Sequence, residues 1–466
     1  MMFIRRPLTI AIIFYLLVTI LFNYQLFCNA FFSCTQSHPS DGIITEYLTE
    51  TSWHNFKTGQ NPYAFEQKLF YPFYSTSALA DPGNAHFIFF GLLRTVSSSH
   101  QALLVIVCIN LLLNYLVMYA LLRKLNIRFP FALIGGFMYG AMPFVSYRVL
   151  NHYTYTPLFL FPLLFICIYM LFTSTARNAK VFYAIILSII GAYLLLSNFY
   201  YFISVVIAGA FLYSYSFVYY GKKMREFIGK NILYISLSAL LFLYLLKPWL
   251  HAVFLYNTLY STSKMQGFGG AWVLSSDLIN VFLPSQYNPL YAFIFSKLAS
   301  VGSIFSKLQI MFLSGYSRNA YAGIVLLISI PSIILLRKKV STSISKLSIM
   351  YLSVSLFFLL LCFGPFLQIF NRWFVSFEDV QVVLPMPFLL LHYVPGMDTL
   401  RAPARFAPLY IFFLVLATNT PSRFVDTIKW PVKPYRLCLL FLLLDNIVQY
   451  FLGCQSELIR VYIPPS

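Results

Sequence analysis

The first residues able to do chemistry follow the first apolar segment of the chain. The stretch from Ser37 to Phe56 contains the carboxylates Asp41, Glu46 and Glu50 and two histidines. An ionised carboxylate acts as a general base when it lies within hydrogen-bond reach of the proton that it removes. Asp41 is therefore a candidate base for an acceptor hydroxyl. The alternative is that Asp41 only caps a helix and complements its dipole.

A second set of residues could hold an anion. Arg148 and His152 are four residues apart, as are Arg401 and Arg405. Side chains at this spacing share one face of a helix, and the planar guanidinium of arginine binds two phosphate oxygens. The run RAPAR (401–405) also opens a helix around a proline, where free backbone N–H groups favour anions. Alternatively, these arginines only reach lipid headgroups, and His152 is a hydrogen-bonded structural residue.

A helix expected over 41–56 must position Asp41. Ser40 or Asp41 caps its start, Lys57 lies in its last turn and Gly59 ends it. Its two faces differ in polarity, with Ile44, Tyr47, Leu48 and Thr51 on the apolar face and Glu46, Glu50, Trp53 and His54 on the other. We expect this helix to lie along the outer membrane surface, followed by a second short helix over 83–93.

Glu46 and Trp53 are candidate substrate contacts because they lie on the same helix as Asp41. The alternative for Glu46 and Glu50 is a solvated helix face without a role in chemistry. For Trp53 it is an anchor at the level of the lipid headgroups.

The composition indicates a membrane protein. The 466 residues are 60% hydrophobic and 10% charged, and apolar runs of near membrane-spanning length recur along the chain. A helix satisfies its own backbone hydrogen bonds, so an all-α polytopic fold is predicted. We expect one domain over 1–466 with eleven spans, at 7–31, 101–122, 130–147, 156–173, 181–197, 200–219, 231–250, 320–336, 345–366, 404–419 and 437–453.

The charge distribution predicts the orientation. The net charge is +19, and the basic residues cluster in alternate loops, which places those loops in the cytoplasm. The amino terminus is then inside and the carboxyl terminus outside, in the inner (plasma) membrane. Three long connections, 33–100, 251–319 and 367–403, fall on the outer side and carry most of the acidic residues. Loops of this length are usually functional, and no nucleic-acid motif accompanies the positive charge.

The cysteines indicate no metal site. The seven cysteines are scattered without a CxxC pair, and a disulfide among Cys28, Cys34 and Cys454 stays an open option. No cofactor is indicated with certainty, and a divalent metal ion also stays open.

Four stretches in order carry a resemblance to a known family. They are Asp41 with Trp53, NPYAF (61–65) and FYP (70–72); the segment 135–163, with its glycines, YR, H and PL; SSDLINVFLP (275–284); and VPGMDTLRAPARFAPL (394–409). Together they resemble a bacterial family of multi-spanning GT-C-type glycosyltransferase-like proteins. The resemblance covers most of the chain. One departure is GYSRNAYAGI (315–324), which has Arg318 where many relatives have a glutamate.

The resemblance implies a GT-C-like fold, an outer-facing site, a sugar donor linked to polyprenyl phosphate and Asp41 as catalytic base. We therefore expect a glycosyltransferase that moves a sugar to a glycan or lipid acceptor of the cell envelope. One alternative is a transporter or flippase of lipid-linked glycans, for which repeated halves and broken helices would be typical. The other is a non-catalytic scaffold of the same fold.

Overall fold

The chain divides into two compact units, which are described separately. The computed structural model describes residues 2–23, 26–28, 30, 41–66, 75–76, 83–146, 148–149, 152–259, 270–283, 320–323, 342–377, 380–394, 397 and 400–420. Unit 1 comprises 1–25, 125–147 and 264–466, and unit 2 comprises 26–124 and 148–263. The described residues are mostly helical, as predicted, and include two small antiparallel sheets.

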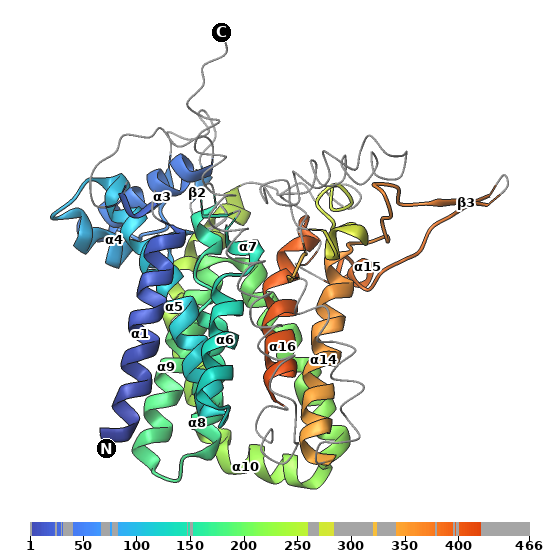
Figure 1. The fold of residues 1–466 in the computed structure, drawn as a ribbon. Coiled ribbons are helices and arrows are strands. Elements are labelled where there is room, and N and C mark those ends of the chain that lie inside the picture. The colour runs from blue at the N-terminus through green and yellow to red at the C-terminus, as the bar shows by residue number, and fades with distance from the viewer. Residues whose placement is uncertain are drawn as a thin grey trace. The chain divides into compact units, whose positions relative to one another are not determined.

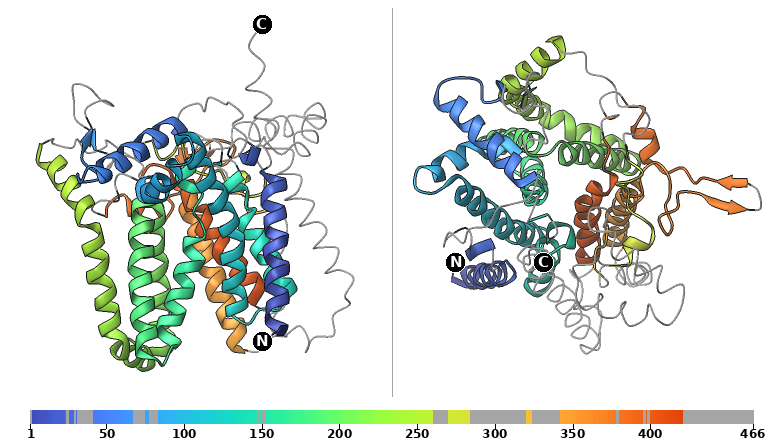
Figure 2. Two further views of the ribbon diagram at one scale, coloured as in Figure 1. Left: turned by 90° about the vertical axis from the view of Figure 1, so that its left-hand side faces the viewer. Right: turned by 90° about the horizontal axis from the view of Figure 1, so that it is seen from above.

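Unit 2 contains the first long connection and a set of long helices. Its helices are α3 (Asp41–Lys57), α4 (Phe87–Arg94), α5 (Ser99–Lys124), α8 (Leu160–Thr173), α9 (Arg177–Ser197) and α10 (Phe199–Leu259). It also contains the 3-10 turns η1 (Gly83–His86) and η2 (Tyr153–Tyr155) and the paired strands β1 (Phe65–Glu66) and β2 (Ser75–Thr76). Within this unit α3 and α4 lie across one end of the long helices (Figures 1 and 2).

Five helical segments of unit 2 are long and apolar enough to cross a membrane. They are Ser99–Lys124, Tyr153–Thr173, Arg177–Ser197, Phe199–Tyr219 and Ile228–Tyr256. The last two are joined inside α10 at Gly221, whose φ of 30° interrupts the helix. These segments confirm the predicted spans from 101–122 and from 156–173 to 231–250. The protein is therefore a helical membrane protein.

The other predicted spans correspond to shorter apolar helices or are not described. Four shorter helices, Pro7–Phe22, Phe129–Val145, Lys346–Cys362 and Pro403–Asn419, coincide with the predictions at 7–31, 130–147, 345–366 and 404–419. Of the predicted span 320–336 only 320–323 is described, and 437–453 lies outside the described residues. The number of eleven spans thus stays a prediction.

Two predicted boundaries are wrong. The first helix, α1 (Met2–Phe22), ends at a turn at Asn23, and residues 26–28 and 30 are helical again, so the segment predicted at 7–31 is not one continuous helix. The buried amide of Asn23 donates to the Thr19 carbonyl at 3.1 Å, and such local side-chain bonds compete with helix continuation. In the other direction, α10 continues to Leu259, so the loop predicted from 251 begins later.

Unit 1 is organised around a pair of helices. Its elements are α1, α6 (Phe129–Gly140), α7 (Pro143–Ser146), η3 (Ile279–Val281), α14 (Thr342–Cys362), β3 (Val375–Phe377), β4 (Val380–Val382), α15 (Phe388–Leu391), η5 (Pro403–Phe406) and α16 (Ala407–Asn419). Ser348 and Ser355 of α14 donate to the carbonyls of Ala417 and Tyr410 at 2.7 and 2.8 Å. Such interhelical hydrogen bonds from small polar residues hold membrane helices together.

The connection into α8 is held by two asparagines of α5. Asn114 Nδ2 donates to the Thr156 carbonyl at 2.9 Å, and its Oδ1 accepts from the Phe159 N–H at 2.7 Å. One turn earlier, Asn110 Nδ2 donates to the Thr156 hydroxyl at 3.1 Å. The Asn114 amide thus replaces backbone hydrogen bonds that a continuous helix would supply, as a non-helical backbone at membrane depth requires, and Asn110 holds the Thr156 side chain.

We predict that Asn114→Ala lowers the melting temperature of the purified protein in detergent. The change removes both hydrogen bonds at a fully buried position, and leaving such groups unsatisfied costs about 1–3 kcal/mol. Asn178→Ala is the matched control because Asn178 is exposed near the start of α9, where a substitution changes stability by less than about 0.5 kcal/mol. Equal melting temperatures for the two variants would contradict the role given to Asn114.

Candidate functional site

The structure confirms the helix predicted to carry Asp41. α3 begins at Asp41 and ends at Lys57. Gly59 has φ of 75°, its N–H donates to the Phe56 carbonyl, and the Gln60 N–H donates to the Asn55 carbonyl at 2.8 Å. This pair of bonds is a Schellman motif, which favours glycine at that position.

The buried face of α3 differs from the predicted one. The buried residues are small or polar for the most part, namely Thr45, Leu48, Thr49, Ser52 and Asn55, whereas Ile44 is exposed. The Thr49 hydroxyl donates to the Thr45 carbonyl at 2.7 Å, so it is satisfied within the helix. The prediction from hydrophobicity alone is wrong for this face. α3 packs against other parts of the protein, where small side chains permit close approach.

Two ion pairs connect the acidic face of α3 to its neighbours. Glu46 Oε2 lies 3.3 Å from His100 Nδ1 at the start of α5, and Glu50 Oε2 lies 3.2 Å from Arg94 Nε at the end of α4. All four side chains are partly exposed, and such pairs contribute only about 0–1 kcal/mol each. Glu46 and Glu50 therefore orient α3 more than they stabilise it, and neither is a purely solvated residue.

Trp53 packs against α4 instead of pointing freely toward lipid headgroups. A Cβ added at Gly91 of α4 would overlap the Trp53 indole. Phe56, one turn later in α3, stacks on Trp53 at 6.0 Å and contacts Phe87 of α4 at 5.4 Å between ring centroids. The absence of a side chain at Gly91 thus sets the distance between α3 and α4.

The predicted pair Arg148 and His152 lies on one turn around a tyrosine. The His152 N–H donates to the Arg148 carbonyl at 2.8 Å, a bond of helical spacing. The Arg148 guanidinium carbon lies 5.1 Å from the centroid of the Tyr155 ring, and the His152 ring meets the same ring edge-on at 5.9 Å. Arg148 is only 6% exposed. It therefore does not extend to the headgroups, and a desolvated cation–π contact contributes about 2 kcal/mol.

This turn lies within the helix layer of unit 2. Thr156 is bound by Asn110 and Asn114, which lie about three and four turns into α5 from Ser99. Residues 153–158 are all buried, and the Tyr155 carbonyl accepts a hydrogen bond of 2.8 Å from the Tyr201 hydroxyl of α10. Non-helical backbone at membrane depth occurs where it is buried in protein or lines a cavity. Such segments commonly form binding sites.

Unit 2 contains the candidate residues of α3 together with Arg148 and His152. α3, which begins with Asp41, contacts η2, which follows His152 directly. α3 also contacts η1, α4 and the start of α5. Asp41, Glu46, Trp53, Arg148 and His152 thus belong to one unit and to elements in mutual contact.

Arg401 and Arg405 belong to unit 1. Arg401 is exposed directly before η5, and Arg405 is half-buried within it. The run RAPAR does open a helix, because η5 begins at Pro403 and leads into α16. Their neighbour Asp398 lies outside the described residues, as does Arg318.

Asp277 has a structural role in unit 1. Its Oδ1 accepts from the Ile279 N–H at 2.9 Å, which caps η3, and its Oδ2 accepts from the Asn371 N–H at 2.8 Å. The buried carboxylate therefore ties the second long connection to the third.

Asn110, Asn114 and Tyr155 are parts of the site that were not predicted from the sequence. Asparagines four residues apart inside an apolar span are a usable signal, since polar groups within the membrane are costly and commonly functional. No comparable signal existed for Tyr155 among the 35 tyrosines of the chain.

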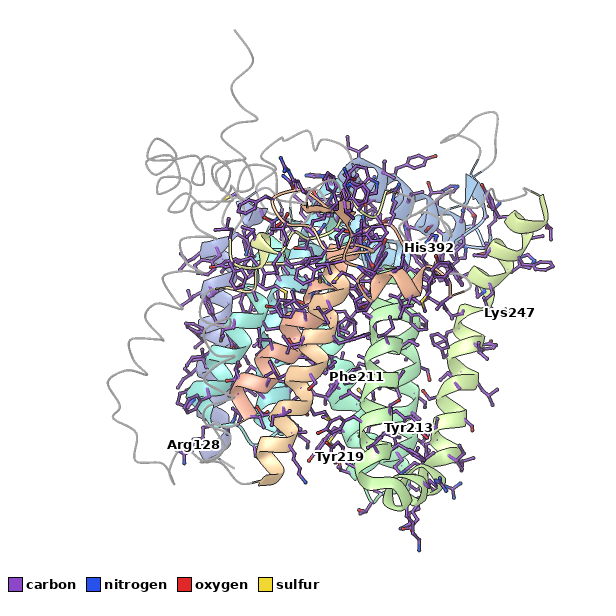
Figure 3. The ribbon with its side chains drawn as sticks, turned by 90° about the vertical axis from the view of Figure 1, so that its right-hand side faces the viewer. Arg128, Phe211, Tyr213, Tyr219, Lys247 and His392 are labelled. Carbon is purple, nitrogen blue, oxygen red and sulfur yellow. The ribbon has the colours of Figure 1, made fainter. Side chains whose placement is uncertain are left out.

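The opposite end of unit 2 is basic. Arg123 and Lys124 end α5, Arg177 and Lys180 begin α9, and Lys222, Arg225 and Lys230 surround the interruption in α10. Figure 3 shows Tyr213 and Tyr219 of α10 toward this end, and Lys247 toward the other. The Asn61 amide donates to the Pro248 carbonyl at 2.9 Å, which links the residues after α3 to the end near Lys247.

Comparisons with known proteins identify no relatives of this chain. No family model matches the sequence, and no curated protein or solved structure matches it. Within the described residues, no group of three or more His, Cys, Asp and Glu side chains is arranged to hold a metal ion. The function is therefore inferred from the residues of the site itself.

We predict opposite effects for two glycine substitutions in helices. Gly91→Ala places a methyl group against the Trp53 indole, and overpacking of this kind costs about 1–3 kcal/mol. Gly209→Ala in α10 meets nothing within 4 Å and gains up to about 1 kcal/mol of helix propensity. Thermal melting in detergent should therefore fall for the first variant and hold or rise for the second. An unchanged or higher value for Gly91→Ala would show that α3 and α4 do not pack as described.

Proposed function

We propose that this protein is a GT-C-like glycosyltransferase that moves a sugar from a polyprenyl-phosphate-linked donor to an acceptor of the cell envelope. The main support is the buried Arg148, which lies on a turn of unit 2 that leads into η2, and η2 contacts α3. A membrane-embedded cation beside a helix that begins with a carboxylate suits a reaction in which a lipid phosphate departs as a hydroxyl attacks.

In this proposal each candidate residue has a separate task. The acceptor oxygen forms a bond to the anomeric carbon, the bond from that carbon to the phosphate oxygen breaks, and the phosphate retains the electron pair. Asp41 takes the proton of the acceptor hydroxyl. Arg148 and His152 hold the phosphate, with charge-assisted bonds that strengthen as negative charge develops. Glu46 and Trp53 orient α3 over the site through His100 and Gly91.

Arg401 and Arg405 are proposed as further phosphate contacts. The support is the four-residue spacing of the two guanidinium groups around Pro403, at the start of η5 and α16. The outer face of the plasma membrane is the proposed site of the reaction, with the amino terminus in the cytoplasm and the carboxyl terminus outside. The basic end of unit 2, opposite α3, supports this orientation.

We predict that Asp41→Asn abolishes sugar transfer without loss of expression. A general base contributes about 10²–10⁴-fold to rate, so a decrease of at least about a hundredfold is expected. The assay uses membranes that contain the variant, a panel of polyprenyl-phosphate-linked hexoses and envelope glycans as acceptors. Glu50→Gln on the same helix is the control, because its exposed pair with Arg94 contributes little. Full activity of Asp41→Asn would remove Asp41 as the base.

Arg148→Lys should reduce the kcat/KM for the donor by about tenfold or more. Lysine keeps the positive charge but cannot form the two parallel bonds of a guanidinium to a phosphate, and charge-assisted bonds contribute about 1.5–3 kcal/mol each. Arg94→Lys is the control, since Arg94 is an exposed partner of Glu50. An equal loss for both variants, with equal melting temperatures, would contradict phosphate binding by Arg148.

The alternative functions give different results in a reconstituted system. Purified protein in vesicles that contain a fluorescent lipid-linked glycan should leave the lipid in its leaflet if the protein is a transferase. Movement of the lipid between leaflets without sugar transfer would establish a transporter or flippase. Neither reaction, together with unchanged envelope glycans after deletion of the gene, would establish a scaffold.

A further inference from the structure

A groove in unit 2 lies on the side of α5 and α9, and Asn110 of α5 and Phe159 of the connection into α8 form part of its wall. Its volume is about 530 Å³, and its lining comes from η1, α4, α5, α8 and α9. The residues that line it include His86, Phe89, Ile106, Ile109, Ile189 and Tyr193. Sites of about 300–1,000 Å³ with a mostly apolar wall and few polar groups are typical of small-molecule ligands.

The groove opens toward the surroundings of the membrane helices. Phe89, Ile109 and Ile189 are 63%, 48% and 47% exposed, and the last two belong to segments that are long and apolar enough to cross a membrane. An occupant that enters from the side at this depth comes from the hydrocarbon layer of the bilayer. An apolar chain there gains dispersion contacts with the wall without a polar group being buried.

His86 is a buried polar side chain in the mostly apolar wall of the groove. It is 3% exposed, and neither ring nitrogen has a hydrogen-bond partner in the part of the chain that the structure describes. It precedes α4 as its N-cap residue, yet its side chain makes no capping bond. A buried polar group without a partner costs about 1–3 kcal/mol. A ligand that supplies the partner removes this cost.

The charge state of His86 selects the chemistry of the ligand. Burial lowers the pKa of His86 to about 4, so the imidazole is neutral near pH 7 and offers one N–H donor and one acceptor. A neutral donor among apolar side chains suits an uncharged acceptor such as an ester carbonyl. A phosphate would instead favour a charged partner such as Arg.

His86 lies at the N-terminal end of α4, on the helix face that lines the groove. His86, Phe89 and Leu93 line the groove at the spacing of one helix face. Phe87 and Gly91 lie on the other face, against Phe56 and Trp53 of α3. The ester groups of bilayer lipids lie between the headgroups and the hydrocarbon layer, which is the level of a surface helix such as α4.

We propose that this groove binds one ester-linked acyl chain of a bilayer glycerolipid, whose ester carbonyl accepts a hydrogen bond from His86. The chain runs between α5 and α9. This site does not depend on the proposed transferase reaction, and neither Asp41, Arg148 nor His152 lines it.

Photocrosslinking in vesicles tests the proposal. The probe is phosphatidylcholine with a diazirine in one acyl chain, and adducts on the full-length protein are mapped by mass spectrometry. We expect adducts on Phe89, Ile109 and Ile189 at several times the level on Leu240 and Leu243, which are exposed apolar residues of α10 outside the groove. Equal labelling of both sets would overturn the site.

Competition between ester and ether lipids tests the hydrogen bond. Unlabelled diester phosphatidylcholine should compete about fivefold better than its diether analogue in the wild-type protein, the factor expected for one neutral hydrogen bond. His86→Phe keeps an aromatic ring and should make the two competitors equal, whereas His392→Phe, outside the groove, should leave the preference intact. Equal competition in the wild-type protein would overturn the role of His86.

A second variant, at the open edge of the groove, tests the proposal even if His86→Phe does not fold. Ile109→Trp enlarges a side chain that is already half-exposed, so the fold tolerates it, and it should reduce adducts on Phe89 and Ile189 severalfold. Unreduced adducts there would show that the chain is not held in the groove.

Discussion

The hydrogen bonds from Asn110 and Asn114 to the segment before α8 are the interaction on which the site depends. A polypeptide at membrane depth needs an internal partner for each backbone N–H and C=O. A continuous helix at 148–159 would meet this requirement but would leave no irregular turn. The Asn114 amide and the Tyr201 hydroxyl supply backbone partners from outside the segment, and the Asn110 amide binds the Thr156 hydroxyl. They allow Arg148 and His152 to lie on a turn within the helix layer.

The same turn explains how unit 2 keeps a cation in an apolar region. Burial of a guanidinium is costly unless neighbouring groups interact with its charge. The Tyr155 ring provides one such contact, and its own carbonyl is occupied by Tyr201. α3 contacts η2, and Glu46 of α3 lies beside His100. A buried positive charge and a helix with several carboxylates are thus assembled within one unit.

Sequence patterns predicted the elements of unit 2 better than their contacts. Long apolar runs predicted its spans because hydropathy and length suffice for that decision, and capping chemistry predicted both ends of α3. The buried face of α3 was mispredicted because Thr45, Thr49 and Ser52 pack against protein, while Ile44 is exposed. The contact of Arg148 with Tyr155 was not predictable, since it depends on the geometry of an irregular turn. The break after Phe22 depended on one local bond of Asn23, which hydropathy does not register.

α4 is a wall shared by the proposed acyl-chain groove and the helix that carries Asp41. One face presents His86 and Phe89 to the groove, and the other presents Gly91 to the Trp53 indole of α3. The contact at Gly91 leaves no space for a side chain, so α4 cannot move toward α3 without displacing the indole. A closely packed pair of this kind transmits displacement instead of absorbing it. The groove and α3 thus share α4 as a closely packed wall.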